Sequence, residues 1–143
     1  MNELEMILNL SLAFVLGGLI GWSREKEGKT AGLRTHILVS VGSALLMVLS
    51  TGMLSKSGIA DPGRIAAGVV TGIGFIGAGC IIQGSDRDTV RGITTAASIW
   101  VTAAIGMAAG IGYYAGAVVA AAFTLITLQL LRLVEKKIIK TKE

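Results

Sequence analysis

Four long stretches without a charged side chain constrain what this chain can fold into. Residues 6–23, 35–55 and 65–85 contain no Asp, Glu, Lys or Arg, and residues 92–131 form a fourth such stretch of 40 residues. A helix needs about 20 apolar residues to cross the hydrocarbon core of a bilayer. The first three stretches therefore each suit one membrane span. The fourth suits a tight helical hairpin, broken at 110–112 beside the interfacial aromatic residues Tyr113 and Tyr114.

These stretches predict an all-α integral membrane protein with five transmembrane helices. The third is rich in glycine, so a re-entrant loop is the alternative there; five crossings agree better with the charge distribution described below. We divide the chain into a transmembrane domain, residues 1–131, and a short basic tail, residues 132–143. The predicted spans are 4–22, 35–54, 65–83, 92–109 and 112–131.

The composition excludes several other classes of protein. Hydrophobic residues make up 52% of the chain and charged residues only 15%, against about 25% in soluble domains. Such hydrophobicity argues against disorder. Cys80 is the single cysteine, so no disulfide framework can form, and together with the single histidine, His36, it cannot complete a zinc site. We expect no metal and no cofactor.

The positive charges predict the orientation, because loops rich in Lys and Arg stay in the cytoplasm. With the N-terminus outside and the C-terminus in the cytoplasm, eleven of the 13 basic residues lie on the cytoplasmic side, and only Lys56 and Arg64 lie outside. A signal peptide is disfavoured because no basic segment precedes the first span. The net charge of +4 suits anionic lipid head groups, and no aromatic platform among the basic residues suggests nucleic-acid binding.

Pairs of glycines four residues apart recur in the predicted spans. Such pairs let helix backbones approach closely where no hydrophobic effect drives association. They can serve packing within one chain, and at least one of them can form the face of a homodimer. A literal G-x-G-x-x-G at 72–77 follows no predicted strand, so it does not indicate a nucleotide site. The pairs are Gly17 and Gly21, Gly68 and Gly72, Gly106 and Gly110, and Gly112 and Gly116.

Two charged loops are predicted to meet on the cytoplasmic side. The loop 22–36 joins the first two spans, and the loop 86–91 joins the third and fourth. We expect an ionic cluster of Arg24, Glu25, Arg34, His36 and Arg91, because charges at a membrane boundary gain from pairing. Arg34 should then matter more to stability than Lys26. Ordinary solvated loops are the alternative.

Two further groups of polar residues lie outside this cluster. On the outer side, Asp61 can cap the third helix with Pro62 at its first position, and Arg64 follows in the first turn. In the fourth span, hydroxyls form a stripe that can line a polar path or bond back to the helix's own carbonyl groups. No nucleophile stands beside a base, so we expect no enzyme. The stripe consists of Thr94, Thr95, Ser98 and Thr102.

Four motifs closely resemble the membrane domain of the MgtC/SapB family. They read GGLIGWSRE at 17–25, AGLRTH at 31–36, RIAA leading to TGIGFIGAG at 64–79, and VRGITTAASIW at 90–100. The resemblance covers residues 5–131, in the order of the family. It implies a multi-pass protein of the bacterial inner membrane, linked in some members to growth at low magnesium, virulence inside macrophages and inhibition of ATP synthase.

Two features differ from the virulence-associated members. Those members look to have Asn where this chain has Thr94 and Cys where it has Val101, and they carry a soluble C-terminal domain beyond the spans. The resemblance therefore supports the membrane module more strongly than the virulence role.

Two functional hypotheses follow from the sequence. The leading one is a non-enzymatic regulatory membrane protein that acts through intramembrane contacts in magnesium limitation or stress, as a homodimer or with a partner such as ATP synthase. The alternative is a small transporter or channel with a polar path along the fourth span.

Overall fold

Five helices form the chain in the computed structural model, which describes residues 2–58, 61–83 and 90–131. The predicted all-helical architecture with five helices is confirmed for these residues, whereas the tail at 132–143 and the acidic loop at 84–89 lie outside them. The helices are α1 (Glu3–Lys26), α2 (Leu33–Ser57), α3 (Pro62–Gly79), α4 (Ile93–Gly110) and α5 (Tyr114–Ile126), the last continued by a π-helical turn, Thr127–Leu131.

Local sequence signals explain where the helices begin. Asn2 and Glu5 form a capping box at the start of α1, in which each side chain accepts from the other residue's backbone N–H. Asp61 caps α3 by accepting from the Gly63 N–H at 2.8 Å, and Pro62 occupies the first helical position. Both caps use side-chain oxygens to satisfy backbone donors that a helix leaves unpaired.

The third helix is shorter than the predicted span, which reached residue 83. It ends at Gly79 and is followed by β1 (Ile82–Gln83), which pairs antiparallel with β2 (Val90–Arg91) just before α4. Gly92 closes this ribbon with a φ of +91°, and a Cβ there would collide with the Cys80 carbonyl group. Only glycine suits both the positive φ and this close backbone approach.

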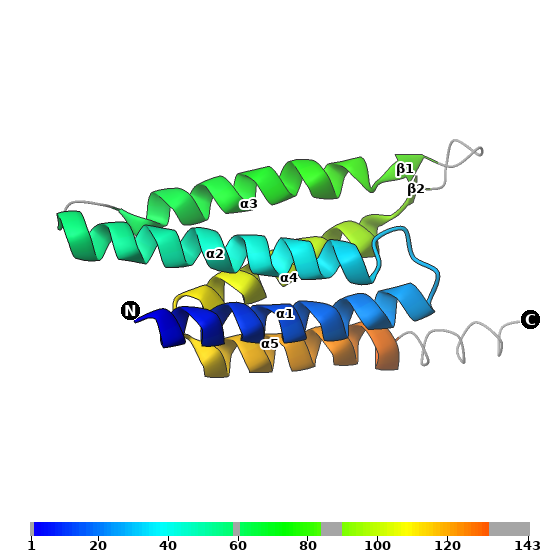
Figure 1. Cartoon of the computed structure of the whole chain (residues 1–143). Helices are drawn as coiled ribbons and strands as arrows, with labels where there is room; N and C mark the ends of the chain where they lie inside the picture. The colour runs from blue at the N-terminus through cyan, green and yellow to red at the C-terminus, as the bar shows by residue number, and fades with distance from the viewer. Residues whose placement is uncertain (1, 59–60, 84–89, 132–143) are drawn as a thin grey trace, which may run out of the picture.

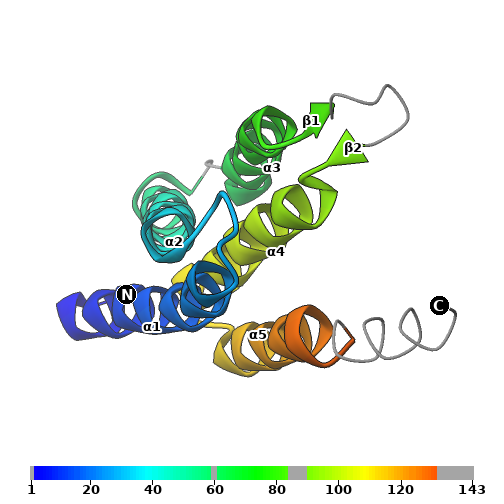
Figure 2. The same cartoon turned by 90° about the vertical axis from the view of Figure 1, so that its right-hand side faces the viewer.

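The helices run up and down in alternation (Figure 1), and α2 packs against both α1 and α4, which also contact each other (Figure 2). Ser40 of α2 marks the crossing of all three helices. A Cβ added at Gly17 of α1 would lie 2.7 Å from the Ser40 Cβ, and one added at Gly106 of α4 would lie 2.2 Å from the Ser40 carbonyl oxygen. Glycine at both positions therefore allows α2 to pack tightly between its neighbours.

The fourth helix also contacts α3 and α5, so it is the central helix of the bundle. In contrast, α3 lies at the edge of the bundle and buries only Val69, Ile73 and Gly77, one residue per turn. α1, the segment Leu33–Leu54 of α2 and α4 are long and apolar enough to cross a membrane, and 114–130 is a shorter apolar helix. The helix lengths thus support a membrane protein.

Candidate functional site

A buried polar core joins α1, α2 and α4 near the C-terminal end of α1 and the start of α2. We define this polar core as Arg24, Glu27, His36, Thr95 and Ser98. The Arg24 side chain is only 2% exposed; it pairs with Glu27 at 3.2 Å and donates from Nη2 to the Thr95 hydroxyl at 3.0 Å. A guanidinium buried among apolar helices needs such partners, because an uncompensated buried charge is costly.

His36 forms the second half of the polar core. Its ring is fully buried, with Nδ1 2.8 Å from the Gly32 carbonyl oxygen and Nε2 3.1 Å from the Ser98 hydroxyl. A carbonyl oxygen can only accept, so Nδ1–H donates to Gly32; the Ser98 hydroxyl donates its proton to the Thr95 carbonyl oxygen and lies beside Nε2. Through Ser98, which also lies 2.8 Å from the Thr95 carbonyl oxygen, His36 ties α2 to the first turns of α4.

The hydroxyl stripe of α4 is divided between two environments. Thr95, Ser98 and Thr102 are buried, whereas Thr94 is exposed; Thr94 and Ser98 both line a groove between α4 and α5. The Thr102 hydroxyl bonds back to the Ser98 carbonyl oxygen at 2.7 Å. Back-bonding therefore accounts for Thr102, while Thr95 and Ser98 serve the polar core.

The ionic cluster expected from the sequence is assembled differently. Arg24 pairs with Glu27, and Glu25 instead accepts from the Leu33 N–H at 2.8 Å, which holds the turn into α2. Arg34 and Arg91 are exposed, and within the described part of the chain neither forms an ion pair with Glu25. The expectation that Arg34 outweighs Lys26 loses its basis, because Arg34 is solvated and Lys26 lies 5.0 Å from the Trp22 ring centroid.

A second polar contact, absent from the sequence analysis, lies at the opposite end of α1. Asn9 is 2% exposed; its Nδ2 donates to the Gly110 carbonyl oxygen at 3.0 Å, and its Oδ1 accepts from the Tyr114 hydroxyl at 2.7 Å. These bonds join α1 to the α4–α5 turn, where Gly112 has a φ of +78°. The sequence signal for this contact was the side-chain amide of Asn9 within the uncharged stretch 6–23, because polar groups in membrane spans face the bundle interior.

The glycine pairs fall into three groups. Gly17, Gly21, Gly106 and Gly110 all face α2, and a Cβ at any of them would come within 3 Å of that helix. Gly112 and Gly116 lie at the α4–α5 turn, where Gly116 faces the Tyr113 ring. Gly68 and Gly72 of α3 have no heavy atom of the described residues within 4 Å of an added Cβ.

These polar groups make contacts between helices. Within the residues described, no group of three or more His, Cys, Asp and Glu side chains could hold a metal ion. Arg24 supplies a positive charge that its carboxylate and hydroxyl neighbours compensate. The polar core can therefore fix the relative positions of α1, α2 and α4.

Three long apolar helices, and glycines of α1 and α4 packed closely against α2, support a helical membrane protein. The MgtC family model matches residues 10–137, and the chain belongs to this family. It is 48% identical over 130 residues to "Putative magnesium transporter YhiD" of Escherichia coli K12, covering 87% of this chain and 60% of that protein.

Further relatives carry other names. Protein MgtC of Brucella abortus is 46% identical over 123 residues, with 86% of this chain and 50% of that protein covered. Protein SrpB of Synechococcus elongatus is 40% identical over 134 residues, with 87% and 74% covered. The chain thus spans 50–60% of the length of the YhiD and MgtC relatives. No solved structure matches.

Proposed function

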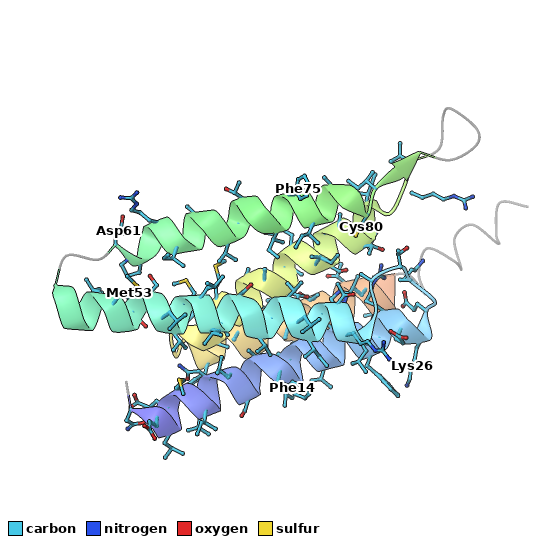
Figure 3. All side chains as sticks on the ribbon, turned by 45° about the horizontal axis from the view of Figure 1, so that its top comes forward. Phe14, Lys26, Met53, Asp61, Phe75 and Cys80 are labelled. Carbon is cyan, nitrogen blue, oxygen red and sulfur yellow. The ribbon has the colours of Figure 1, made fainter. Side chains whose placement is uncertain are left out.

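We propose that this chain is a non-enzymatic regulatory membrane protein that acts through contacts of α3 with another transmembrane helix. The observation that carries the proposal is the one-sided packing of α3. The glycines of α1 and α4 contact α2. In contrast, α3 packs against the bundle only through its stripe of buried residues and exposes the rest of its circumference. Figure 3 places Phe75 on this helix, and its side chain is 84% exposed.

The exposed side of α3 has the residues that helix association in a membrane needs. Ala67, Thr71, Gly74 and Ala78 are all exposed and follow one another at spacings of four, three and four, which places them on one helix face. The Thr71 hydroxyl bonds to the Ala67 carbonyl oxygen at 2.9 Å, so it is satisfied at lipid depth. Small side chains on such a face let a second backbone approach closely.

Two partners fit this face: a second copy of the chain, giving a homodimer, and a separate membrane protein. The family resemblance makes ATP synthase the first separate partner to test. Magnesium limitation is the condition in which we expect the contact to matter, since magnesium appears in the name of the YhiD relative.

Replacing Gly74 with leucine is expected to abolish the contact, because a bulky side chain separates the two backbones where packing is the main attraction. If the partner is a second copy, purified wild-type protein should have twice the chain mass of 14.7 kDa. If the partner is ATP synthase, the wild-type protein should inhibit ATP-driven proton pumping in inverted vesicles. Gly74→Leu should lose the dimer mass or the inhibition, and cells that carry it should no longer grow in low-magnesium medium. Ala122→Leu on the exposed side of α5 is the matched control. Equal behaviour of the two variants in all three assays would contradict the proposal.

The proposed orientation places the N-terminus outside and the C-terminus in the cytoplasm of a bacterial inner membrane. It is supported by the distribution of basic residues and by the alternating directions of the five helices. A cysteine introduced at Lys56 should react with a membrane-impermeant thiol reagent in intact cells, and one at Lys29 only after permeabilisation, in a background that lacks Cys80. The reverse pattern would overturn the orientation.

A transport function is the second candidate, supported by the continuous buried polar chain from Arg24 through Thr95 and Ser98 to His36. The buried positive charge of Arg24 makes this chain unfavourable for a divalent cation. Magnesium uptake into liposomes containing the purified protein separates the two functions. Uptake above that of empty liposomes, lost in Ser98→Val, would favour transport over regulation.

A further inference from the structure

A groove of about 610 Å³ runs between α2 and α3. We call it the α2–α3 groove and define it by Leu38, Gly42 and Leu46 of α2 and Arg64, Gly68 and Gly72 of α3. All its other lining residues are apolar except Ser43. Its volume lies within the range of small-molecule sites.

Three glycines create this groove. A Cβ added at Gly42, Gly68 or Gly72 would meet no heavy atom of the described residues within 4 Å. On the next face of α3, by contrast, a Cβ at Gly77 would lie 3.6 Å from Ala96 of α4, in ordinary contact. α3 therefore packs against α4 and leaves a space, lined by glycine on both walls, beside α2.

The groove has one charged end. Arg64 lies in the first turn of α3, is exposed, and forms no ion pair with any carboxylate among the described residues. Asp61, three residues earlier, is engaged in capping the helix through Gly63. Figure 3 shows Asp61 at this end of α3. An apolar channel that ends at an unpaired cation is complementary to an amphiphile with an anionic head.

The length of the groove suits a hydrocarbon chain. On α3 it extends from Arg64 to Ile76, about 18 Å at the helical rise per residue. One leaflet of a bilayer has a hydrocarbon thickness of about 15 Å, so an acyl chain matches this length.

We propose that the α2–α3 groove binds one anionic phospholipid, with an acyl chain against Gly42, Gly68 and Gly72 and the head-group phosphate on Arg64. Burial of the chain supplies the apolar part of the affinity. The guanidinium group, which can bind a phosphate through two parallel hydrogen bonds, supplies the preference for an anionic head. The proposal is independent of the proposed function, because Gly74 and its neighbours on the contact face do not line the groove.

Native mass spectrometry of the full chain in mild detergent tests this site, with phosphatidylglycerol and phosphatidylethanolamine added in equal amounts. We expect one phosphatidylglycerol to remain bound to the wild-type chain, with at least a tenfold preference over phosphatidylethanolamine. Gly72→Leu fills the groove and should reduce retention of both lipids tenfold or more. Arg64→Gln should keep a bound lipid and lose the preference. Arg34→Gln, which removes an exposed charge away from the groove, should behave as wild type.

A second substitution and a folding measurement separate filling of the groove from misfolding of the chain. Gly42→Leu fills the groove from the opposite wall, and circular dichroism melting identifies any variant that has lost its helices. The proposal is overturned if folded Gly72→Leu and Gly42→Leu retain phosphatidylglycerol as wild type does, or if Arg64→Gln keeps the full preference. It is also overturned if the species retained in the groove is a second protein chain, which the leucine variants then release.

Discussion

Gly106→Ala is expected to destabilise the packing of α4 against α2 strongly. The new Cβ would lie 2.2 Å from the Ser40 carbonyl oxygen and 2.9 Å from the Ser40 Cα, so backbone and not a flexible side chain must move. Overpacking of this kind costs about 1–3 kcal/mol and occasionally more. We expect about 3 kcal/mol here, measured as a loss of thermal stability in detergent.

Gly52→Ala is the matched control, because it makes the same change within α2 at a position with nothing within 4 Å of the added Cβ. Alanine is favoured over glycine within helices by about 0.5–1 kcal/mol, so this variant should melt at or slightly above the wild-type temperature. A Gly106→Ala protein that melts with the control would show that α2 and α4 are less closely packed than the 2.2 Å approach implies.

The glycine pairs show what a sequence can predict about packing in a membrane protein. Gly17 and Gly106 belong to pairs with the same spacing as Gly68 and Gly72, so spacing alone treats them alike. Their roles differ because Ser40 of α2 lies opposite both Gly17 and Gly106, whereas an added Cβ at Gly68 or Gly72 meets no heavy atom of the described residues within 4 Å. Which helix a glycine faces depends on residues far away in the chain, and local periodicity does not contain that information.

The helices themselves were predictable, because the absence of charge over about 20 residues is a strong local signal. The end of α3 was not. Residues 80–83 are as apolar as a helix interior, yet the close approach of Gly92 to Cys80 turns the chain into a short ribbon. That contact forms across a loop, so it overrides a hydropathy pattern that would continue the helix.

The pairing of Arg24 with Glu27 could have been predicted from the sequence. With α1 ending at Lys26 rather than at residue 22, Glu27 lies three residues from Arg24, on the same side of the helix, while Glu25 is adjacent in sequence and points elsewhere. The other two arginines of the expected cluster stay outside the polar core because they are exposed. Arg34 lies in the first turn of α2, and Arg91 lies on β2 just before α4. Thr95 and Ser98 bind Arg24 and His36 because α4 packs beside both α1 and α2.

Arg24→Ala is therefore expected to lower stability far more than Arg34→Ala. Removing the guanidinium leaves the Glu27 carboxylate and the Thr95 hydroxyl without a donor that the native structure provides at 3.2 and 3.0 Å. Breaking a buried ion pair from one side costs about 3–5 kcal/mol, and the cost here is lower because the Glu27 side chain is 12% exposed. The exposed Arg34 side chain should cost less than about 0.5 kcal/mol. Thermal unfolding of both variants in detergent measures the difference.

A double-mutant cycle separates the ion pair from the packing of the long Arg24 side chain. Much of the cost of Arg24→Ala comes from the carboxylate left behind, so adding Glu27→Gln should recover part of the lost stability. If Arg24 acts only through its apolar stem, Glu27→Gln adds its own cost to that of Arg24→Ala and recovers nothing. The sign of the coupling thus tells whether the charge or the volume of the Arg24 side chain carries its contribution to stability.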